Sequence, residues 1–323
     1  MKHAVRSRLI AQRARSYFVR LGLAVPDVRV AHSSALRTPY EMRLSREGGR
    51  VTALYNLSMF RHGSYQMKHL SAAYWYWFAQ AGDVRAALCD LSDGERAGRA
   101  RFAYSSNRDA VIALPDAYFF RDRGFADADR LGQQAPAWQD RSEEILGRGS
   151  ANGIGLFTCD PANARTPGVM QRMRLAMLSR DIDGVDVRFA PGSRDYVDAE
   201  LDAAGLIGPK VPQDSWAGRK FAIDIDGVTN TWDNFLRRLK MGCCVLKVAS
   251  PFGFAQWYYP LLRPFEHYVP IRADLSDLAE QIDWVRAHPA KAAQIAEAGQ
   301  AAARALTFET ETARAVELMT THA

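Results

Sequence analysis

Two aspartates and a run of hydroxyl and amide side chains stand where an α/β protein could hold a phosphate-bearing ligand. Asp224 and Asp226 end the segment FAIDID (221–226), in which apolar and acidic positions alternate as in a strand with one apolar face. Gly227 interrupts this strand, and three residues that cap helices well follow it: Thr229, Asn230 and Thr231. Amides at a helix start attract phosphate. Asp226 itself would bind hydroxyl groups of such a ligand, or only cap the turn.

The elements around this turn are predicted from local patterns. Apolar residues spaced along one helical face begin at Trp232, and Gly242 ends the predicted helix. CCVLKV (243–248) is then typical of a buried parallel strand. A strand, helix and strand in this order form a right-handed βαβ unit, so the turn is expected at the carboxyl edge of a sheet.

A second stretch with binding chemistry is ILGRGSANGIG (145–155), predicted to begin as a strand and to end in a glycine-rich loop. Gly149 and Ser150 would let the backbone approach a phosphate, and Arg148 could add a bidentate charged contact. Neither the GxGxxG fingerprint nor the GxxxxGK[ST] P-loop occurs in the chain.

The amino-terminal half contains one acid in a position typical of catalytic groups. Residues 84–91 (VRAALCDL) resemble a short buried strand, and Asp93 follows directly. Acids at the carboxyl end of a strand often take part in catalysis, but an acid in such a turn can equally cap it.

Length and composition favour two α/β domains. A chain of 323 residues with 48% apolar residues can supply two cores. We expect an amino-terminal domain at 1–135 and a carboxyl-terminal one at 136–306, with 307–323 packing back on the first. The sequence has no apolar run of membrane-spanning length and no secretory signal, so a cytoplasmic location is expected.

The net charge of +6 is concentrated in the first twenty residues, where six basic residues precede the first acid. The rest is formally neutral, which argues against a nucleic-acid-binding protein. This segment is expected to be a helix whose apolar stripe is Ile10, Ala14, Tyr17 and Leu21, with Phe18 beside them. Two interpretations stay open: a helix docked on the protein with a solvated basic face, or weak attachment to anionic lipid at the inner face of the membrane.

Several ordered pieces of the chain resemble glycosyltransferase family 90, which includes protein O-glucosyltransferases, capsule-associated xylosyltransferases and bacterial lipopolysaccharide-modifying proteins. The resemblance covers roughly 85–306, with these pieces: LPDAYFF, GRGSANG, DIDG, TNTW, GCCVLKV, QWYYPLLRPFEHYVPI, DLSDL and IAEAGQAAARAL. It implies a GT-B architecture, in which two Rossmann-like domains face each other across a cleft. It also implies inverting transfer from a UDP-sugar without an essential metal or other cofactor.

The resemblance also implies roles for single residues. The family's general base lies near the end of an amino-terminal-domain strand, which best matches Asp93, with Asp90 as the nearest competitor. The donor would be bound by two groups of residues. The first group, in the glycine-rich loop, is Arg148, Gly149 and Ser150. The second group, in the turn that follows the strand 221–226 and in the strand 243–248, is Asp226, Gly227, Asn230, Thr231, Trp232 and Lys247.

The sequence departs from the family at the start of the predicted helix. Asp233 stands where relatives carry an arginine. A leaving diphosphate must be met by cations and helix-end amides. Lys247, Arg237 or Arg238 would have to replace the missing arginine, and Lys247 is preferred because it lies in the matching strand.

Together these observations predict a cytoplasmic transferase that moves a hexose or pentose from a UDP-sugar to a surface glycan or a lipopolysaccharide or glycolipid precursor. The alternative is a non-catalytic protein of the same fold that binds sugar nucleotides or glycans, which the missing arginine would favour. A dinucleotide-dependent oxidoreductase fits the α/β layout but lacks the glycine fingerprint.

Overall fold

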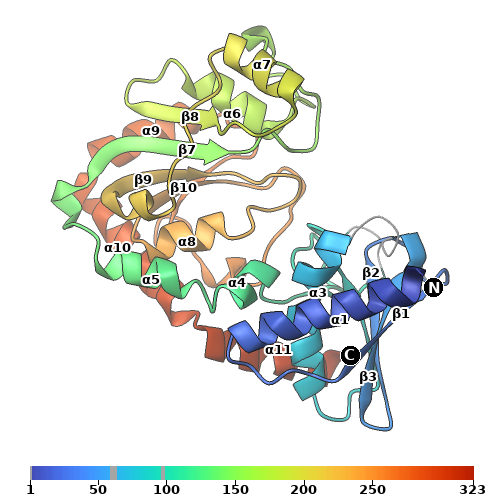
Figure 1. The fold of residues 1–323 in the computed structure, drawn as a ribbon. Helices are drawn as coiled ribbons and strands as arrows, with labels where there is room; N and C mark the ends of the chain where they lie inside the picture. Colours follow the sequence, from blue (N-terminus) through green and yellow to red (C-terminus); the bar gives the residue numbers. More distant parts are fainter. Residues whose placement is uncertain (1, 59–63, 96–98) are drawn as a thin grey trace. The chain divides into compact units, whose positions relative to one another are not determined.

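The computed structural model describes residues 2–58, 64–95 and 99–323 (Figure 1). The chain separates into two compact units that exchange segments near the carboxyl terminus. Unit 1 contains Met1–Phe125, Phe254–Tyr259 and Leu306–Ala323, and unit 2 contains Ala126–Gly253 and Pro260–Ala305. The functional division predicted from the sequence, into 1–135 and 136–306, stays a prediction.

Unit 1 is a six-stranded sheet with helices. Its strand order is β1-β3-β2-β4-β5-β6. Its elements are α1 (Lys2–Arg20), β1 (Val28–Ser33), β2 (Glu41–Glu47), β3 (Arg50–Asn56), α3 (Ser64–Gln80), β4 (Ala86–Asp90), β5 (Phe102–Ala103), β6 (Ile112–Ala113), α4 (Ala117–Arg121) and α11 (Phe308–His322).

The sheet of unit 1 is mixed, because β2 runs antiparallel to both of its neighbours, β3 and β4, while the other pairs are parallel. A two-residue turn, Gly48 and Gly49, joins β2 to β3, with φ angles of 55° and 81°. Two positive φ angles suit the tight hairpin turn that matches strand twist, and glycine adopts them without steric cost. The α/β class is confirmed here, although this sheet is not the all-parallel one of a Rossmann domain.

Unit 2 is a five-stranded sheet in the order β11-β10-β9-β7-β8, and all of its strand pairs are parallel. Its elements are α5 (Ala126–Gln133), β7 (Ser142–Gly149), α6 (Gln171–Ser179), β8 (Val185–Phe189), α7 (Asp195–Ala203), β9 (Arg219–Asp224), α8 (Asn234–Lys240), β10 (Cys244–Val248), β11 (Val269–Ile271), α9 (Leu278–Ala287) and α10 (Pro289–Ala305). Short 3₁₀ turns occur at Trp138–Asp140, Pro161–Asn163, Asp214–Gly218 and Tyr259–Leu261.

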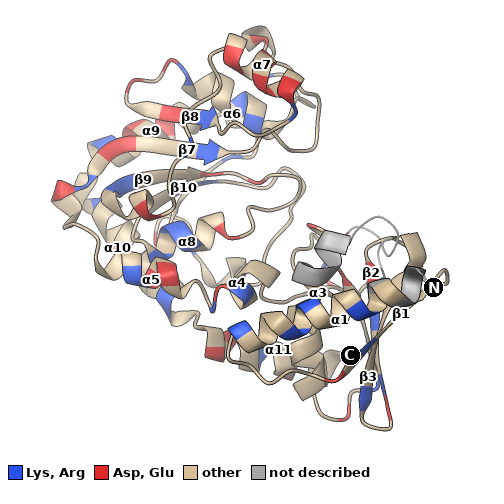
Figure 2. Ribbon diagram, in the orientation of Figure 1, with Lys and Arg blue, Asp and Glu red and all other residues tan. Residues whose placement is uncertain are grey.

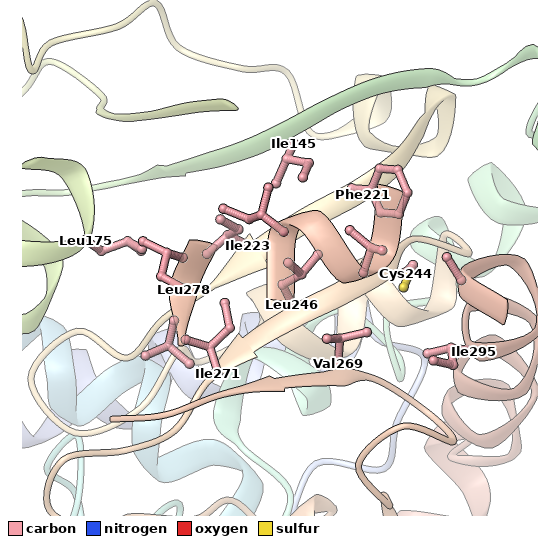
Figure 3. Close-up of a cluster of buried hydrophobic side chains, with 14 of the residues drawn as sticks. Ile145, Leu175, Phe221, Ile223, Cys244, Leu246, Val269, Ile271, Leu278 and Ile295 are labelled. Atoms are coloured by element: carbon pink, nitrogen blue, oxygen red, sulfur yellow. The ribbon is translucent and has the colours of Figure 1, made fainter. Parts of the chain in front are cut away.

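A large apolar cluster packs this sheet against helices α6, α9 and α10 (Figure 3). Strand residues such as Ile145, Leu246 and Ile271 pack against Leu175 of α6 and Ile295 of α10, and all five are almost completely buried. Burial of one such side chain contributes about 1.5–3 kcal/mol, so this cluster fixes the strands whose ends carry the polar residues.

The predicted strand, turn, helix and strand are confirmed. β9 pairs in parallel with β10, and α8 lies between them in sequence and contacts both. Gly242 ends the helix with a φ of 81°, which glycine accepts readily. The helix itself begins at Asn234, three residues after the predicted capping run. Within the described residues, no helix has the length and apolarity needed to cross a membrane.

Candidate functional site: an arginine-lined pocket at the edge of the unit 2 sheet

The strand order of unit 2 identifies the edge at which a ligand is expected. From β7 the chain moves to one side, to β8, and from β9 it moves to the other, to β10 and β11. The order therefore reverses between the neighbouring strands β7 and β9. Open α/β sheets bind ligands at the carboxyl ends of the strands at such a reversal.

A pocket that is partly open to solvent lies at this position. It is lined by the carboxyl ends of β7, β8 and β9 and by residues of α6 and α8. The lining includes one carboxylate, Asp224, and four arginines, namely Arg148, Arg172, Arg188 and Arg238. An excess of guanidinium groups in a concave site favours a ligand with negative charge. Figure 2 shows blue residues on β7, α6 and α8.

Arg148 lies in β7 and not in a loop, so the glycine-rich loop begins only after Gly149. This corrects the predicted location. The Arg148 guanidinium donates to both carboxylate oxygens of Asp186 on β8, at 3.2 and 2.6 Å. Arg188 shares the same carboxylate. Burial would raise the pKa of Asp186, but hydrogen bonds from Arg188 and Arg148 outweigh it and lower the pKa to about 2. The buried Nε of Arg148 has no hydrogen-bond partner.

The residue that connects the two predicted binding stretches is Arg172, on α6. Its guanidinium donates to the Ser150 carbonyl at 3.0 Å and to Asn152 Oδ1 at 2.7 Å on one side. On the other side it donates to the Ile225 carbonyl at 3.1 Å and the Asp226 carbonyl at 2.9 Å. Burial lowers the pKa of Arg172, and Asp224 and Asp226 act in the opposite direction. The sequence does not single out Arg172, because its partners are mostly backbone carbonyls of distant segments.

Gly227 lies where these two stretches approach each other. A Cβ at Gly227 would come within 3.0 Å of Asn152 Oδ1 and 3.3 Å of Arg172 Nη2. A side chain at this position would therefore displace the contacts that hold the edge together. The Gly227 amide also donates to the Asn230 carbonyl at 3.0 Å, which closes the turn.

Lys247 is held between two buried carboxylates. Its ammonium is 2.8 Å from Asp224 Oδ2 and 2.8 Å from Asp226 Oδ1. All three side chains are at least nine-tenths buried. Two negative charges and one positive charge give this trio a net charge of −1, so Lys247 already neutralises protein acids. This weakens the expectation that it replaces the family's helix arginine.

The turn before α8 is buried and internally bonded. Asn230 Oδ1 accepts from the Trp232 amide at 2.6 Å. Trp232 has a φ of 54°, a left-handed conformation that costs a non-glycine residue free energy. The buried Thr231 hydroxyl has no hydrogen-bond partner. These three residues do not line the arginine pocket, whereas Arg148 and Gly149 do.

The two helix arginines differ in their partners. Arg237 is paired with Asp127 at 2.7 Å and with Asp233 at 2.8 Å. Arg238 is equally buried, but its guanidinium donates only to two amide oxygens, Gln213 Oε1 at 2.8 Å and Asn234 Oδ1 at 3.2 Å.

Arg238 also lies 3.6 Å above the ring of Trp216. Among the described residues no carboxylate forms an ion pair with it. Burial lowers the pKa of Arg238 to about 10. Arg238 is therefore a buried pocket cation without an anionic protein partner.

The two acids considered for catalysis lie in unit 1. The Asp90 side chain is buried, and its Oδ1 accepts from the Ser92 amide at 2.7 Å and from the Ser92 hydroxyl. Burial raises the pKa of Asp90, while the hydrogen bonds from Ser92 act against this. Asp93 is partly exposed, in the bend after β4. Asp90 is thus engaged in the turn, and Asp93 is the more accessible carboxylate.

Comparison with known proteins identifies the carboxyl-terminal part of the chain. Residues 204–322 match the model of Glycosyl transferase family 90. The chain contains a glycosyl transferase family 90 domain. The matched residues include Trp216, Asp224, Asp226, Arg238 and Lys247. The resemblance noted in the sequence is thereby confirmed, while Arg148 and Arg172 lie outside the matched segment.

Curated relatives match this chain over short segments. Protein O-glucosyltransferase 2 of Danio rerio is 47% identical over 102 residues, which is 31% of this chain and 20% of the relative. Protein O-glucosyltransferase 3 of Rattus norvegicus is 36% identical over 87 residues, or 27% of this chain and 16% of the relative. An uncharacterized protein, 179R, of Invertebrate iridescent virus 6 is 38% identical over 99 residues, or 29% of this chain and 8% of the relative. The chain therefore spans at most a fifth of these relatives.

Solved structures are similar only distantly. The Anabaena protein HepE, solved with UDP-glucose, has a TM-score of 0.38 and 16% identity, over 61% of this chain and 53% of HepE. Trehalose 6-phosphate synthase of Burkholderia multivorans has a TM-score of 0.38 and 12% identity, over 68% of this chain and 49% of that enzyme. Scores this low carry no argument about function.

Proposed function

We propose that the protein is a glycosyltransferase that binds a UDP-sugar in the arginine-lined pocket of unit 2 and transfers its sugar to a hydroxyl group. One observation supports this most: within the described residues, the partners of Arg238, a buried guanidinium in the pocket and in the family 90 domain, are two amide oxygens and an aromatic ring, with no ion pair. A buried charge is costly unless it is paired, and a diphosphate would supply the missing negative charge.

The donor would be held by both stretches singled out in the sequence. Arg148, with its unpartnered Nε, would contact the diphosphate. Gly149 and Ser150 would bring the backbone close to it; a Cβ at Gly149 would come within 3.2 Å of Arg172 Nη1, so a side chain there would crowd this guanidinium. Arg238 takes over the part expected of Lys247, because Lys247 is neutralised by its two aspartates.

The turn and strand residues would contribute mainly by position. Asp226 keeps one buried oxygen, Oδ2, without a hydrogen-bond partner, which could accept from a ribose or sugar hydroxyl. Thr231 likewise has a free buried hydroxyl. Gly227, Asn230 and Trp232 would hold the turn in shape, and Lys247 would hold the Asp226 carboxylate in place through their ion pair.

Catalysis would follow an inverting course without an essential metal. Asp93 would accept the proton of the acceptor hydroxyl as that oxygen bonds to the anomeric carbon of the sugar. The bond from this carbon to the diphosphate breaks on the opposite face, and the electron pair leaves with UDP, whose charge the pocket arginines stabilise.

The acceptor is proposed to be a surface glycan or a lipopolysaccharide or glycolipid precursor. The proposed place of action is the cytoplasm, at the inner face of the membrane, where such precursors are accessible to a weakly attached enzyme. The basic helix α1 would make this attachment.

A thermal-shift screen tests the proposal. UDP, UDP-sugars, GDP-, CMP- and dTDP-sugars are compared in EDTA, and UDP compounds at about a hundredfold their Kd should raise stability by about 2.7 kcal/mol. Slow hydrolysis of the stabilising UDP-sugar in EDTA should accompany binding. Binding without any turnover across donors and acceptors would instead favour the non-catalytic protein, for which the aspartate at position 233 argues. No stabilisation by any UDP compound would refute the donor site itself.

A further inference from the structure

The exposed face of α1 has the features of a lipid-binding surface, although its sequence stripe does not serve this purpose. Ile10, Ala14, Tyr17 and Phe18 are buried in unit 1. Tyr17 stacks on Phe120 with ring centroids 6.4 Å apart. The apolar stripe noted in the sequence therefore docks the helix, and the docked interpretation is confirmed. Any lipid contact must come from the opposite face.

That opposite face carries aliphatic side chains in solvent. Val5 is 54% exposed, Leu9 45% and Val19 68%. Val5 and Leu9 are four residues apart, and Val19 falls on the same side of the helix. A soluble helix normally turns polar residues outward, so three exposed aliphatic residues on one strip require an explanation.

Two rows of arginines border this strip. Arg8 and Arg15 lie seven residues apart on one side, and Arg13 and Arg20 lie seven apart on the other. Seven residues are close to two helical turns, so each pair forms a row along the helix. All four side chains are exposed.

These arginines are free to bind an external anion. None of them forms an ion pair with a carboxylate in the part of the chain that the structure describes; Arg20 contacts the Tyr17 ring. The segment Lys2–Arg20 contains no acid, and its coloured part in Figure 2 has blue bands and no red ones.

We propose that this surface, made of Val5, Leu9 and Val19 with the two arginine rows, binds the interface of an anionic lipid bilayer. The aliphatic side chains enter the boundary between headgroups and acyl chains, while the arginines on both sides reach lipid phosphates through their flexible stems. A nucleic acid or an acidic protein would use the arginines but would leave the aliphatic strip without a partner. The inference deepens the proposed function by naming a partner, and it rests on that function only for the acceptor's location.

Vesicle flotation tests the surface with the full chain. The probes are vesicles of phosphatidylcholine with about one third phosphatidylglycerol, and vesicles of phosphatidylcholine alone, at physiological salt. We expect binding to the anionic vesicles only. Arg13→Ala with Arg20→Ala should weaken it about thirtyfold, from roughly 1 kcal/mol per basic residue. Leu9→Ser with Val19→Ser should weaken it by about tenfold, because apolar insertion is lost.

The control has the same loss of charge elsewhere. Arg165→Ala with Lys210→Ala removes two exposed basic residues of unit 2 and should leave flotation nearly unchanged. All variants alter exposed side chains. An unchanged melting temperature without ligand reports that a variant is folded, and an unchanged thermal shift with UDP reports that it still binds the donor. A failure of donor binding in the wild type would therefore not affect this test.

Three results would overturn the proposal. The first is absence of wild-type binding to anionic vesicles at physiological salt. The second is equal binding to neutral vesicles. The third is a large loss in the arginine variant without any loss in the serine variant, which would indicate attraction to polyanions in general.

Discussion

Replacing Arg238 by methionine should separate the stability of the empty protein from its affinity for UDP. Burial lowers the pKa of this guanidinium from its ordinary value to about 10. At about 1.4 kcal/mol per pKa unit, keeping the charge buried costs the empty protein about 3 kcal/mol. Because the folded pKa is the lower one, the folded state binds the proton more weakly. The cost is therefore present in full at every pH below about 10.

Two losses oppose this gain in Arg238→Met. The contact with the Trp216 ring contributes up to about 2 kcal/mol. The Gln213 and Asn234 oxygens lose a donor, but both residues have access to water. Methionine keeps most of the side-chain volume. We therefore expect an unfolding free energy that is unchanged or up to about 1 kcal/mol higher.

The same substitution should sharply reduce UDP affinity. A hydrogen bond to a charged group contributes about 1.5–3 kcal/mol, so the Kd should rise by about tenfold to more than a hundredfold. With a thirtyfold weaker Kd, the UDP concentration that stabilises the wild type by about 2.7 kcal/mol would stabilise the variant by only about 0.9 kcal/mol. Urea denaturation and calorimetry measure the two effects.

The neighbouring Arg237 gives a matched control, because its replacement should change the free energy of unfolding in the opposite direction. Its guanidinium is paired with Asp127 and Asp233, so Arg237→Met should lower stability by leaving these acids without a cation. A wild-type Kd for UDP in Arg238→Met would refute the reasoning. So would a loss of more than about 2 kcal/mol of stability, since Arg238 would then be a structural cation rather than one that awaits a ligand.

Three further predictions concern single side chains. Asp93→Asn should abolish sugar transfer in a coupled UDP-release assay while calorimetry still detects UDP binding, and normal transfer would show that the base is assigned wrongly. Asp90→Ala should instead lower the free energy of unfolding by about 1–2 kcal/mol, because Ser92 loses its hydrogen-bond acceptor. Lys247→Met should lower the free energy of unfolding measured in urea by about 3–5 kcal/mol, because Asp224 and Asp226 stay buried without their ion-pair partner. The control Lys220→Met, whose partner Glu143 is exposed, should lower it by less than about 1 kcal/mol. Equal losses would show that Lys247 is not needed to neutralise Asp224 and Asp226. Arg172→Gln should accelerate amide hydrogen exchange in 150–153 and 225–227, because its guanidinium bonds to both stretches, whereas Arg174→Gln on the same helix should not. Unchanged exchange in both variants would show that Arg172 does not hold the two stretches together.

The βαβ unit formed by β9, the turn after it, α8 and β10 could be predicted because each boundary has a local cause. Alternating apolar residues define β9, and Gly242 takes the φ of 81° that ends α8. The hairpin of unit 1 was equally predictable, since Gly48 and Gly49 turn the chain within two residues. In each case the residues that determine the structure are close in sequence.

The position of Arg148 could not be predicted, because glycines on both sides of it are typical of a loop. In the structure, Gly147 packs against Val187 of the neighbouring strand, where a Cβ would come within 3.0 Å of the valine side chain. The glycine is therefore needed for close packing between strands rather than for a turn. Only the identity of the neighbouring strand distinguishes these two uses.

The roles of the basic residues depend on partners that are distant in sequence. Arg172 bonds to carbonyls more than fifty residues away, at Ile225 and Asp226, and backbone carbonyls leave no mark in a sequence. Arg237 and Arg238 are adjacent, but the local Asp233 and the distant Asp127 both pair with Arg237 and neither pairs with Arg238. The sequence shows which cations exist, but tertiary contacts decide which one stays available.

The balance of charge around the pocket connects these contacts to the proposed donor. Four arginines and Asp224 line the pocket, namely Arg148, Arg172, Arg188 and Arg238 with that aspartate. Ion pairs connect three more charged groups to this lining: Asp186 pairs with Arg148 and Arg188, Lys247 pairs with Asp224, and Asp226 pairs with Lys247. The set contains five cations and three carboxylates. Two positive charges are left over. The diphosphate of a nucleotide sugar carries two negative charges, so side chains alone could neutralise the donor. When the bond to the sugar breaks, the departing UDP gains negative charge, which interacts most strongly with cations that have no competing carboxylate. Two of these five cations, Arg172 and Arg238, form no ion pair within the described residues, and Arg172 is already committed to four carbonyl and amide oxygens of the sheet edge. Arg238 therefore best meets that condition, and its removal should affect UDP more than any change at Lys247.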